Sequence, residues 1–221
     1  MIPNKSKVNY QLKMEQIIST LPKDRVPVLF LHVCCAPCSS YVLETLSRYF
    51  KIRLFFYNPN IFPQEEYLYR LSEVKRLISE LPLQNPVEVI GGEYCPERFN
   101  ELAKGLENEP ERGERCRKCI GLRLAETIKK AAAESADFVT TTLSISPHKD
   151  AEFINEKGVQ LCKEYGAVWL YSDFKKKGGY LRSIALSKEY NLYRQDFCGC
   201  VYSKAVRMRE KADQSCLNNP H

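Results

Sequence analysis

The stretch VLFLHVCCAPCSSYV, residues 28–42, decides the fold class of this chain. Its first part, Val28–Val33, is a continuous apolar run with the length and composition typical of a buried parallel strand. A cluster of cysteines follows directly, and beyond it Val42, Leu46 and Tyr49 lie at helical spacing. A strand that passes through a short turn into a helix is the repeating unit of a parallel α/β sheet.

The same alternation of strand and helix continues along the chain. Apolar runs of strand length recur at Ile52–Tyr57, Val87–Gly92, Asp137–Leu143 and Ala167–Tyr171. Helical patterns are expected over residues 8–20, 67–81, 121–135 and 151–165, and after CCAPCSS in the stretch with Val42, Leu46 and Tyr49. The chain therefore predicts an α/β fold in which a parallel sheet is covered by helices on both faces.

In parallel sheets of this kind the functional site lies beyond the carboxyl ends of the strands. The cysteine cluster follows the first strand, and the loop SISPHKD, residues 144–150, follows the fourth, so both are expected to face one crevice. We assign residues 1–174 to an α/β domain that carries the cysteine-rich catalytic site. Residues 175–221, with a helical stretch at 189–195, are assigned to a C-terminal appendage that folds back over the crevice.

The composition excludes several classes of protein. Of the 221 residues, 44% are hydrophobic and 27% charged, so the chain can form a core and is not intrinsically disordered. Its longest apolar run is far shorter than the ~18 residues of a membrane span, and its N-terminus does not resemble a signal peptide. We therefore expect a cytoplasmic protein with no membrane partner. The net charge of +6 is compatible with a nucleic-acid partner without requiring one. The glycine-rich motifs of nucleotide sites are absent, so no nucleotide cofactor is indicated.

The cysteines are the sharpest chemical signal. The chain has ten, and in a protein without a secretion signal this number indicates metal or redox chemistry rather than a disulfide framework. Most of them are clustered, in CCAPC (Cys34, Cys35 and Cys38), CRKC (Cys116 and Cys119) and CGC (Cys198 and Cys200).

Two of these clusters have the spacing of metal ligands. Cys116 and Cys119 lie just before a long predicted helix, where two thiolates three residues apart can bind one metal ion or the edge of a cluster. Cys34 and Cys35 lie at a strand-to-helix turn, where both can point at one centre. The spacing predicts a metal site made by these four residues but does not choose between zinc and iron–sulfur. A competing grouping pairs Cys35 with Cys38 as a CxxC of thioredoxin type.

Cys198 and Cys200 are separated by a single residue. Thiols at this spacing close only a small, strained disulfide, and strained disulfides are the reducible, catalytic ones. Gly199 supplies the backbone freedom that such a closure needs. The aromatic neighbours Phe197 and Tyr202 are suited to stacking on a base or ring. The pattern favours a redox-active dithiol, with a pair of additional metal ligands as the alternative.

Histidines and basic residues give weaker signals. His32 lies in a predicted buried strand and is interpreted as a satisfied core group, whereas His148, in a loop, is either a surface residue or a functional acid. Lys175–Lys177 and Arg182 form the densest basic cluster. It is either an ordinary solvated turn or, with the tyrosines and Arg194 nearby, a surface for RNA.

Four segments together resemble the QueH family of epoxyqueuosine reductases. They are HVCCAPCSSYV (32–42), ERCRKC (114–119), TTTLSISPHKD (140–150) and LYRQDFCGCVYS (192–203). The resemblance runs from about residue 26 to 205. It implies a Rossmann-like fold related to the PP-loop (HUP-type) nucleotide-binding domains, with thiols where those relatives carry a phosphate-binding loop.

The resemblance also implies an activity. QueH enzymes remove the epoxide oxygen of epoxyqueuosine at the wobble position of a tRNA anticodon, which is the last step of queuosine synthesis. The implied partners are a tRNA with a queuosine-type anticodon and an external electron donor. The resemblance further implies that Cys34, Cys35, Cys116 and Cys119 bind a [4Fe-4S] cluster. The redox-active pair, a disulfide when oxidised, is Cys198 and Cys200; alternatively this pair binds a second iron together with an acid such as Asp196.

Two other functions are compatible with the residues alone. One is a zinc-stabilised RNA-binding module without catalysis. The other is a different tRNA-modifying enzyme on this fold, such as a cluster-dependent sulfur transferase.

Overall fold

The computed structural model describes residues 8–217, with side chains up to Gln214. Its elements follow in the order α1 (Tyr10–Ser19), β1 (Val28–His32), α2 (Ala36–Leu46), β2 (Lys51–Phe56), α3 (Gln64–Glu80), β3 (Val87–Gly91), α4 (Pro96–Ala103), α5 (Glu114–Ala133), β4 (Phe138–Thr141), the 3₁₀ turn η1 (Thr142–Ile145), α6 (Ala151–Tyr165), α7 (Gly179–Glu189) and α8 (Val201–Leu217). None of the helices in this range combines the length and apolar composition that a membrane crossing requires.

The described strands form one parallel sheet in the order β3-β2-β1-β4. In the central strand, Leu29 is paired with Ile52 of β2 on one side and with Phe138 of β4 on the other. The expected α/β class with a parallel sheet is therefore confirmed.

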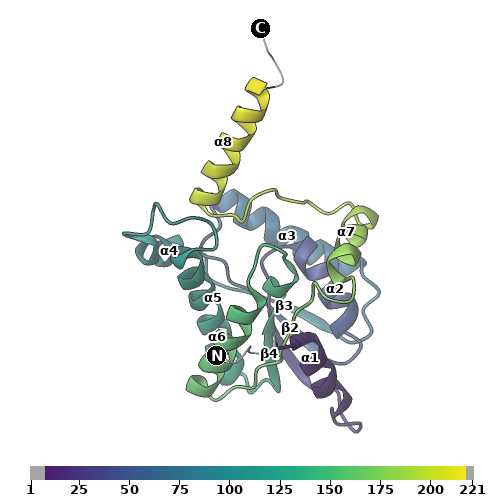
Figure 1. The fold of residues 1–221 in the computed structure, drawn as a ribbon. Coiled ribbons are helices and arrows are strands. Elements are labelled where there is room, and N and C mark those ends of the chain that lie inside the picture. The colour runs from purple at the N-terminus through teal and green to yellow at the C-terminus, as the bar shows by residue number, and fades with distance from the viewer. Residues whose placement is uncertain (1–7, 218–221) are drawn as a thin grey trace, which may run out of the picture.

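Helices cover both faces of the sheet, as expected (Figure 1). Alternate residues of a strand point to opposite faces, so Leu29, Leu31 and Val33 pack with α2 and α3, while Phe30 packs with α5 and α6. All four side chains are fully buried, and each burial of this kind stabilises the fold by roughly 1.5–3 kcal/mol. This double burial explains why the strand reads as a continuous apolar run.

The fifth predicted strand, 167–171, is only an isolated bridge. Val139 and Trp169 are bridge partners, and no ladder extends from them within the described residues. The indole of Trp169 packs directly on Gly158 of α6 and donates to the side-chain oxygen of Asn155. Asn155 also accepts from the backbone N–H of Ser172, so the chain turns toward α6 instead of following β4.

Two helix boundaries differ from the sequence-based expectation. The long helix α5 begins at Glu114, so Cys116 and Cys119 lie in its first two turns rather than before it. The predicted helix at 189–195 is wrong, because α7 ends at Glu189 and Asn191 adopts a left-handed conformation with φ of 46°.

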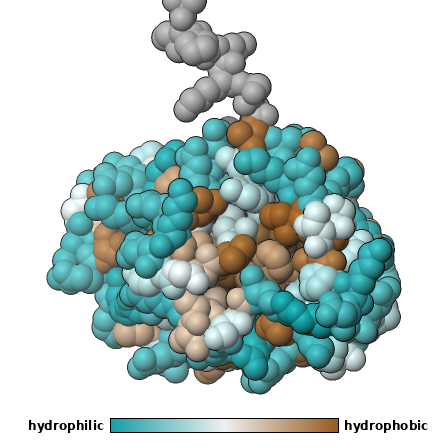
Figure 2. Space-filling model, turned by 90° about the horizontal axis from the view of Figure 1, so that it is seen from below, coloured by the Kyte–Doolittle hydropathy of each residue, from teal (hydrophilic) through white to brown (hydrophobic). Residues whose placement is uncertain are grey.

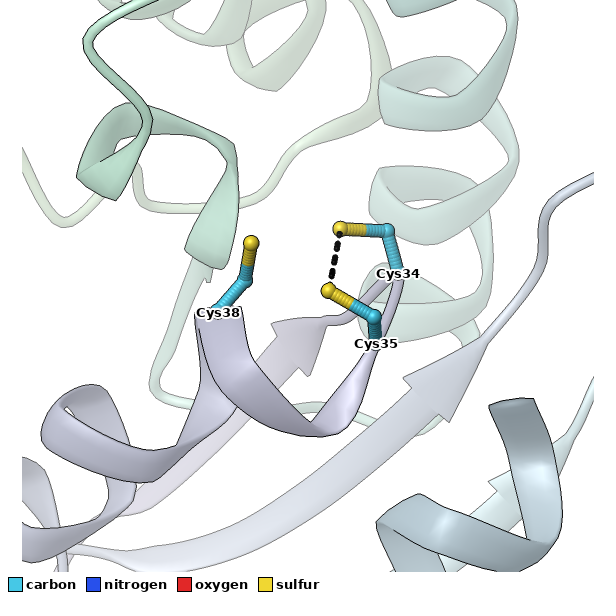
Figure 3. A group of neighbouring side chains, drawn as sticks. All are labelled: Cys34, Cys35 and Cys38. Atoms are coloured by element: carbon cyan, nitrogen blue, oxygen red, sulfur yellow. Dashed lines mark hydrogen bonds between the residues drawn. The ribbon is translucent and has the colours of Figure 1, made fainter. Parts of the chain in front are cut away.

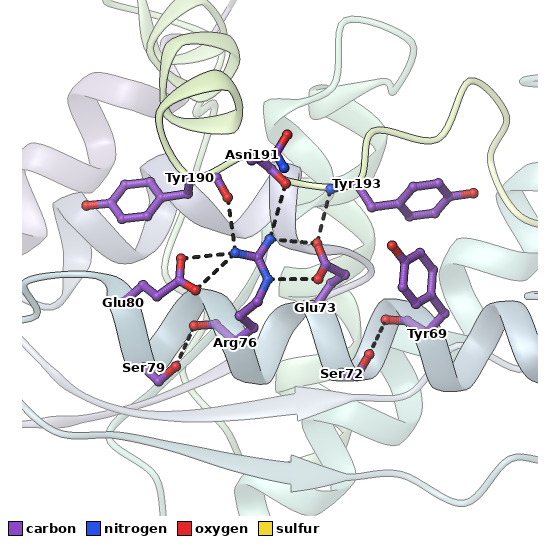
Figure 4. A network of polar contacts seen from close by, with 9 residues as sticks. All are labelled: Tyr69, Ser72, Glu73, Arg76, Ser79, Glu80, Tyr190, Asn191 and Tyr193. Atoms are coloured by element: carbon purple, nitrogen blue, oxygen red, sulfur yellow. Dashed lines mark hydrogen bonds and ion pairs between the residues drawn. The ribbon is translucent and has the colours of Figure 1, made fainter.

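Contacts with α3 hold the segment after α7 in this irregular path (Figure 4). Arg76 donates to the carbonyl oxygens of Tyr190 and Asn191 over 3.1 and 3.3 Å, and Glu73 accepts from the backbone N–H of Tyr193 over 3.1 Å. Backbone groups that bind these side chains are not available for helical hydrogen bonds.

The C-terminal region lies against the crevice in part, because residues 194–198 and the first turns of α8 line it. Helix α7 packs against α2, where Arg182 binds Glu44. Helix α8 projects away from the body of the molecule, and only its first turns lie against it (Figure 1).

The face turned away from α8 has a largely hydrophilic rim, with hydrophobic residues gathered near its centre (Figure 2).

Candidate metal and redox site

The site lies where the order of the sheet reverses. From β1 the chain proceeds outward to β2 and β3, and β4 then pairs with the opposite edge of β1. In open α/β sheets, ligands bind at this switch point, beyond the carboxyl ends of the strands. The segment after β1 carries Cys34 and Cys35, and the segment after β4 continues into the loop with Lys149.

His32 forms the buried floor below this point and is a satisfied core group, as predicted. Its Nε2 lies 3.1 Å from the carbonyl oxygen of Tyr57, which can only accept, so Nε2 carries the proton. Its Nδ1 therefore accepts from the hydroxyl of Thr141 over 2.8 Å. Burial lowers the pKa of His32 to about 4, which keeps the ring neutral.

Three thiols gather at the start of α2 (Figure 3). The Sγ atoms of Cys34, Cys35 and Cys38 all lie within 4.8 Å of one another, and those of Cys34 and Cys35 are 3.8 Å apart. Cys35 is the extended N-cap residue of α2, with Pro37 in the first turn, and this turn aims neighbouring side chains at one point. Among the side chains that the structure describes, this is the one close group of three potential metal ligands. It fits a metal that prefers sulfur.

Hydrogen bonds within the group leave one thiol easily ionised. Hydrogen bonds from Cys34 and Cys38 lower the pKa of Cys35. The hydrogen bond to Cys35 raises the pKa of Cys34 to about 11. The pKa of Cys38 is also raised, by its hydrogen bonds to Cys34 and Cys35. Without a metal, the negative charge of the group is therefore concentrated on Cys35, while Cys34 and Cys38 keep their protons. Metal ligation releases protons from thiols, so metal affinity at this site depends on pH.

A second set of cysteines lines an adjoining cavity of about 310 Å³. Cys116 and Cys119 come from α5, and Cys198 and Cys200 from the segment before α8. Cys119 and Cys200 share a small hydrophobic cluster with Phe99. Burial raises the pKa of Cys119 to about 11 and also raises that of Cys200.

The two sets of thiols share one wall. Cys34, Cys35 and Cys38 line a cavity of about 590 Å³, and Arg123, Lys149 and Cys198 line both this cavity and the first one. The structure thus brings all the predicted cysteine segments to one region. Cys116 and Cys119 do not join the close group at Cys34 within the described residues, so the four-cysteine ligand set stays a prediction.

Lys149 is a charged group beside the thiol of Cys198. Its Nζ lies 3.5 Å from the Sγ of Cys198, and its side chain is 11% exposed. The negative charge of a Cys198 thiolate is the main cause that raises the pKa of Lys149. A lysine held at this position favours an anion on Cys198 or on an oxygen atom beside it.

The CGC segment is held by α3. Arg70 is 1% exposed, donates to the carbonyl oxygen of Cys198 over 3.1 Å and lies over the Phe197 ring. Gly199 has a φ of 122°, and its carbonyl oxygen accepts from the backbone N–H of Phe62. A side chain at Gly199 would meet Arg70, so glycine is required here for both conformation and space.

Cys198 and Cys200 are both free thiols in this structure. The Sγ of Cys200 accepts from the backbone N–H of Ser203 in the first turn of α8. No disulfide links the two residues in this structure, so the redox-active pair stays a prediction. The carboxylate of Asp196, the acid considered for a second iron, pairs with Arg207 and Lys211 of α8.

The basic cluster predicted as an RNA surface is largely neutralised. Lys175 pairs with Asp173, Lys177 with Glu15 and Arg182 with Glu44, with N–O distances of 2.7, 2.6 and 2.5 Å. His148 is exposed, contacts Arg112 and lies at the edge of the larger cavity.

Comparisons of the sequence with known proteins agree on one family. A sequence model described as epoxyqueuosine reductase QueH matches residues 29–206. The chain belongs to the epoxyqueuosine reductase QueH family. The resemblance and the expected class of enzyme, an oxidoreductase that reduces epoxyqueuosine, are therefore confirmed.

Relatives within the QueH family match most of the chain. Proteins named epoxyqueuosine reductase QueH from Streptococcus pyogenes serotype M1 and from Thermotoga maritima are 42% and 34% identical over 210 and 193 residues. These matches cover 94% and 85% of this chain, and 82% and 95% of the relatives. The chain is also similar to a solved structure, the U34-tRNA thiolase NcsA from Methanococcus maripaludis with its [4Fe-4S] cluster. The TM-score is 0.47 and the sequence identity 9%, and the match covers 87% of this chain and 67% of the thiolase chain.

Two residues of the site were not found from the sequence. Arg70 is far from the CGC segment along the chain, and no local pattern links them. Arg123 does follow Cys119 by four residues on one helix, so both lie on the same helical face. That spacing could have identified Arg123 as a site residue.

Proposed function

We propose that this chain reduces epoxyqueuosine in the anticodon of a tRNA, with Cys198 and Cys200 as the redox-active pair and a [4Fe-4S] cluster held by Cys34, Cys35, Cys116 and Cys119. The observation that carries the proposal is the shared wall, in which Cys198 and Lys149 line both thiol cavities. We also propose a cytoplasmic location and an external electron donor.

The residues present fit such a cluster. The close thiol group supplies soft ligands, and the thiols of α5 line the adjoining cavity. When bound, the cluster supplies electrons one at a time. We keep a second iron near Cys198 and Cys200 as an alternative, although its candidate acid, Asp196, is engaged with α8.

The chain's own residues account for the atoms of the reaction. Removal of the epoxide oxygen consumes two electrons and two protons, breaks both carbon–oxygen bonds and leaves a carbon–carbon double bond and water. Cys198 and Cys200 as thiols contain these electrons and protons, and they become a disulfide that the donor must reduce. Lys149 lies beside Cys198, where its ammonium donates a hydrogen bond to the leaving oxygen and stabilises negative charge on it.

The test is to purify the protein without oxygen, measure iron, sulfide and zinc, and assay conversion of epoxyqueuosine in tRNA. We expect about four irons and four sulfides per chain and a broad thiolate–iron absorption band. Conversion should require the cluster and a reductant. A colourless protein with stoichiometric zinc and no conversion contradicts the proposal and favours a zinc-stabilised RNA-binding module.

The C-terminal region, 175–221, is proposed as the part that engages the RNA, through α8 rather than through the neutralised cluster at Lys175. Helix α8 starts at the mouth of both cavities, and its side chains beyond the first turn are mostly exposed. Among the described side chains, Lys204 and Arg209 have no ion-pair partner. Arg209 lines the smaller cavity, and Lys204 is exposed in the first turn of α8. Unpaired cations at these positions are suited to the phosphates that flank an unpaired base.

We therefore predict that the double variant Lys204→Glu/Arg209→Glu binds the substrate tRNA more weakly. Its plot of log affinity against log salt should be less steep, by about 1 for each phosphate that the variant no longer binds. Fluorescence anisotropy over a salt series measures both quantities. The matched control is Lys51→Glu/Lys163→Glu, which changes two exposed lysines on β2 and α6. Equal reductions of affinity in both double variants would contradict a specific role for α8.

A further inference from the structure

Arg123 is a buried cation without an acidic partner. Arg123 is 2% exposed, and among the side chains that the structure describes no carboxylate forms an ion pair with it. Its Nε donates to the carbonyl oxygen of Cys119 over 3.3 Å, and its Nη1 donates to the Oδ1 of Asn58 over 3.4 Å. A buried charge with only neutral partners destabilises a protein by several kcal/mol. Its presence therefore indicates an anion nearby.

The surroundings of Arg123 identify where that anion lies. The guanidinium lines both thiol cavities. Arginine remains protonated under all ordinary conditions, so the positive charge is permanent.

Local structure holds this charge in one place. Cys116, Cys119 and Arg123 share one face of α5, because they lie at positions i, i+3 and i+7. Asn58 donates to the carbonyl oxygen of Val33, directly before Cys34, and at the same time accepts from Arg123. The guanidinium is thus tied to both cysteine-bearing segments.

We infer that Arg123 is the fixed counter-charge of the metal centre between the strand β1 and the helix α5. A [4Fe-4S] cluster with four thiolate ligands has a net negative charge, and reduction makes it more negative. A fixed positive charge therefore stabilises the reduced form more than the oxidised form and raises the reduction potential. This inference rests on the proposed function for the identity of the metal.

The test compares Arg123→Gln with Arg123→Lys. Glutamine removes the charge but can still donate to Asn58, while lysine keeps the charge. The control is Arg98→Gln, on the neighbouring helix α4. The guanidinium of Arg98 donates to the hydroxyl of Tyr57 and to the carboxylate of Glu126, and Arg98 lines neither thiol cavity. Iron content and the midpoint potential of the centre are measured for each protein without oxygen.

We expect Arg123→Gln to lower the midpoint potential. At a fixed potential, the ratio of reduced to oxidised centre should fall at least about tenfold. For one electron this change is equivalent to a shift of ~59 mV. Arg123→Lys and Arg98→Gln should stay near the wild-type potential. If Arg123→Gln takes up no iron while Arg123→Lys does, the counter-charge is supported as a requirement for assembly. An unshifted potential in Arg123→Gln, an equal shift in Arg98→Gln, or loss of iron in both Arg123 variants overturns the inference.

Failure of the proposed function has a different signature. If the wild-type protein binds zinc instead of iron, zinc affinity takes the place of the midpoint potential as the test of the counter-charge. We then expect Arg123→Gln to bind zinc about tenfold more weakly than the wild type. Unchanged zinc affinity would then overturn the inference as well.

Discussion

Cys198→Ser is expected to lower conversion of epoxyqueuosine at least ~10³-fold while leaving the iron content and the melting temperature unchanged. Serine has nearly the same shape as cysteine, so the packing of the segment is preserved. Its hydroxyl cannot supply the electrons that a thiol releases when a disulfide forms. Cys198 is the partly exposed member of the pair and the one beside Lys149, so its loss removes the sulfur that can reach a substrate.

The measurement is a single-turnover assay without oxygen, with the nucleosides of the digested tRNA separated and quantified. Cys95→Ser is the matched control, because Cys95 is also a partly exposed free thiol but lies at the start of α4 and lines neither cavity. Wild-type conversion by Cys198→Ser would exclude the redox pair. Loss of iron together with activity would instead favour Cys198 as a ligand of a second iron.

Cys34→Ser is expected to remove most of the bound iron and to lower the melting temperature. Metal sites of this kind form only in the folded state, so their binding free energy stabilises the fold. A loss of ~3 kcal/mol corresponds to ~6–12 °C in a chain of this size. Anaerobic metal analysis and thermal unfolding of the same preparations measure both effects.

The control for this variant is Cys162→Ser. Cys162 is 4% exposed in the hydrophobic cluster between the sheet and α5 and α6, where burial raises its pKa to about 12. Serine there buries an additional hydroxyl and costs ~1–3 kcal/mol, but the metal should remain. If Cys162→Ser loses as much iron as Cys34→Ser, general destabilisation rather than ligand loss explains the result. The same measurements on Cys38→Ser show whether the third thiol of the close group also binds the metal.

The sequence alone determined the features that depend on local periodicity. Val28–Val33 reads as a buried strand because both of its faces are covered, and that pattern is visible without knowledge of the covering helices. Alternation of strands and helices then placed the cysteines after β1 and the loop after β4 at one end of the sheet. The cysteine spacing indicated metal and redox chemistry because ligand geometry is largely set by neighbours in the chain.

Only the tertiary structure decided the features that depend on partners far away in sequence. Residues 167–171 have the composition of a strand but form a single bridge, because Trp169 and Ser172 bind Asn155 of α6. The stretch 189–195 has helical periodicity but binds Arg76 and Glu73 of α3.

The same reason explains what the sequence could not show about the site. The basic cluster at Lys175 is neutralised by acids from distant segments, such as Glu15, so its composition gave no measure of its free charge. The position of Arg123 and Lys149 between two sets of thiols arises from packing α5 and the loop after β4 against β1. Residue types and spacing determine which chemistry is available, whereas long-range packing determines which charges and thiols meet.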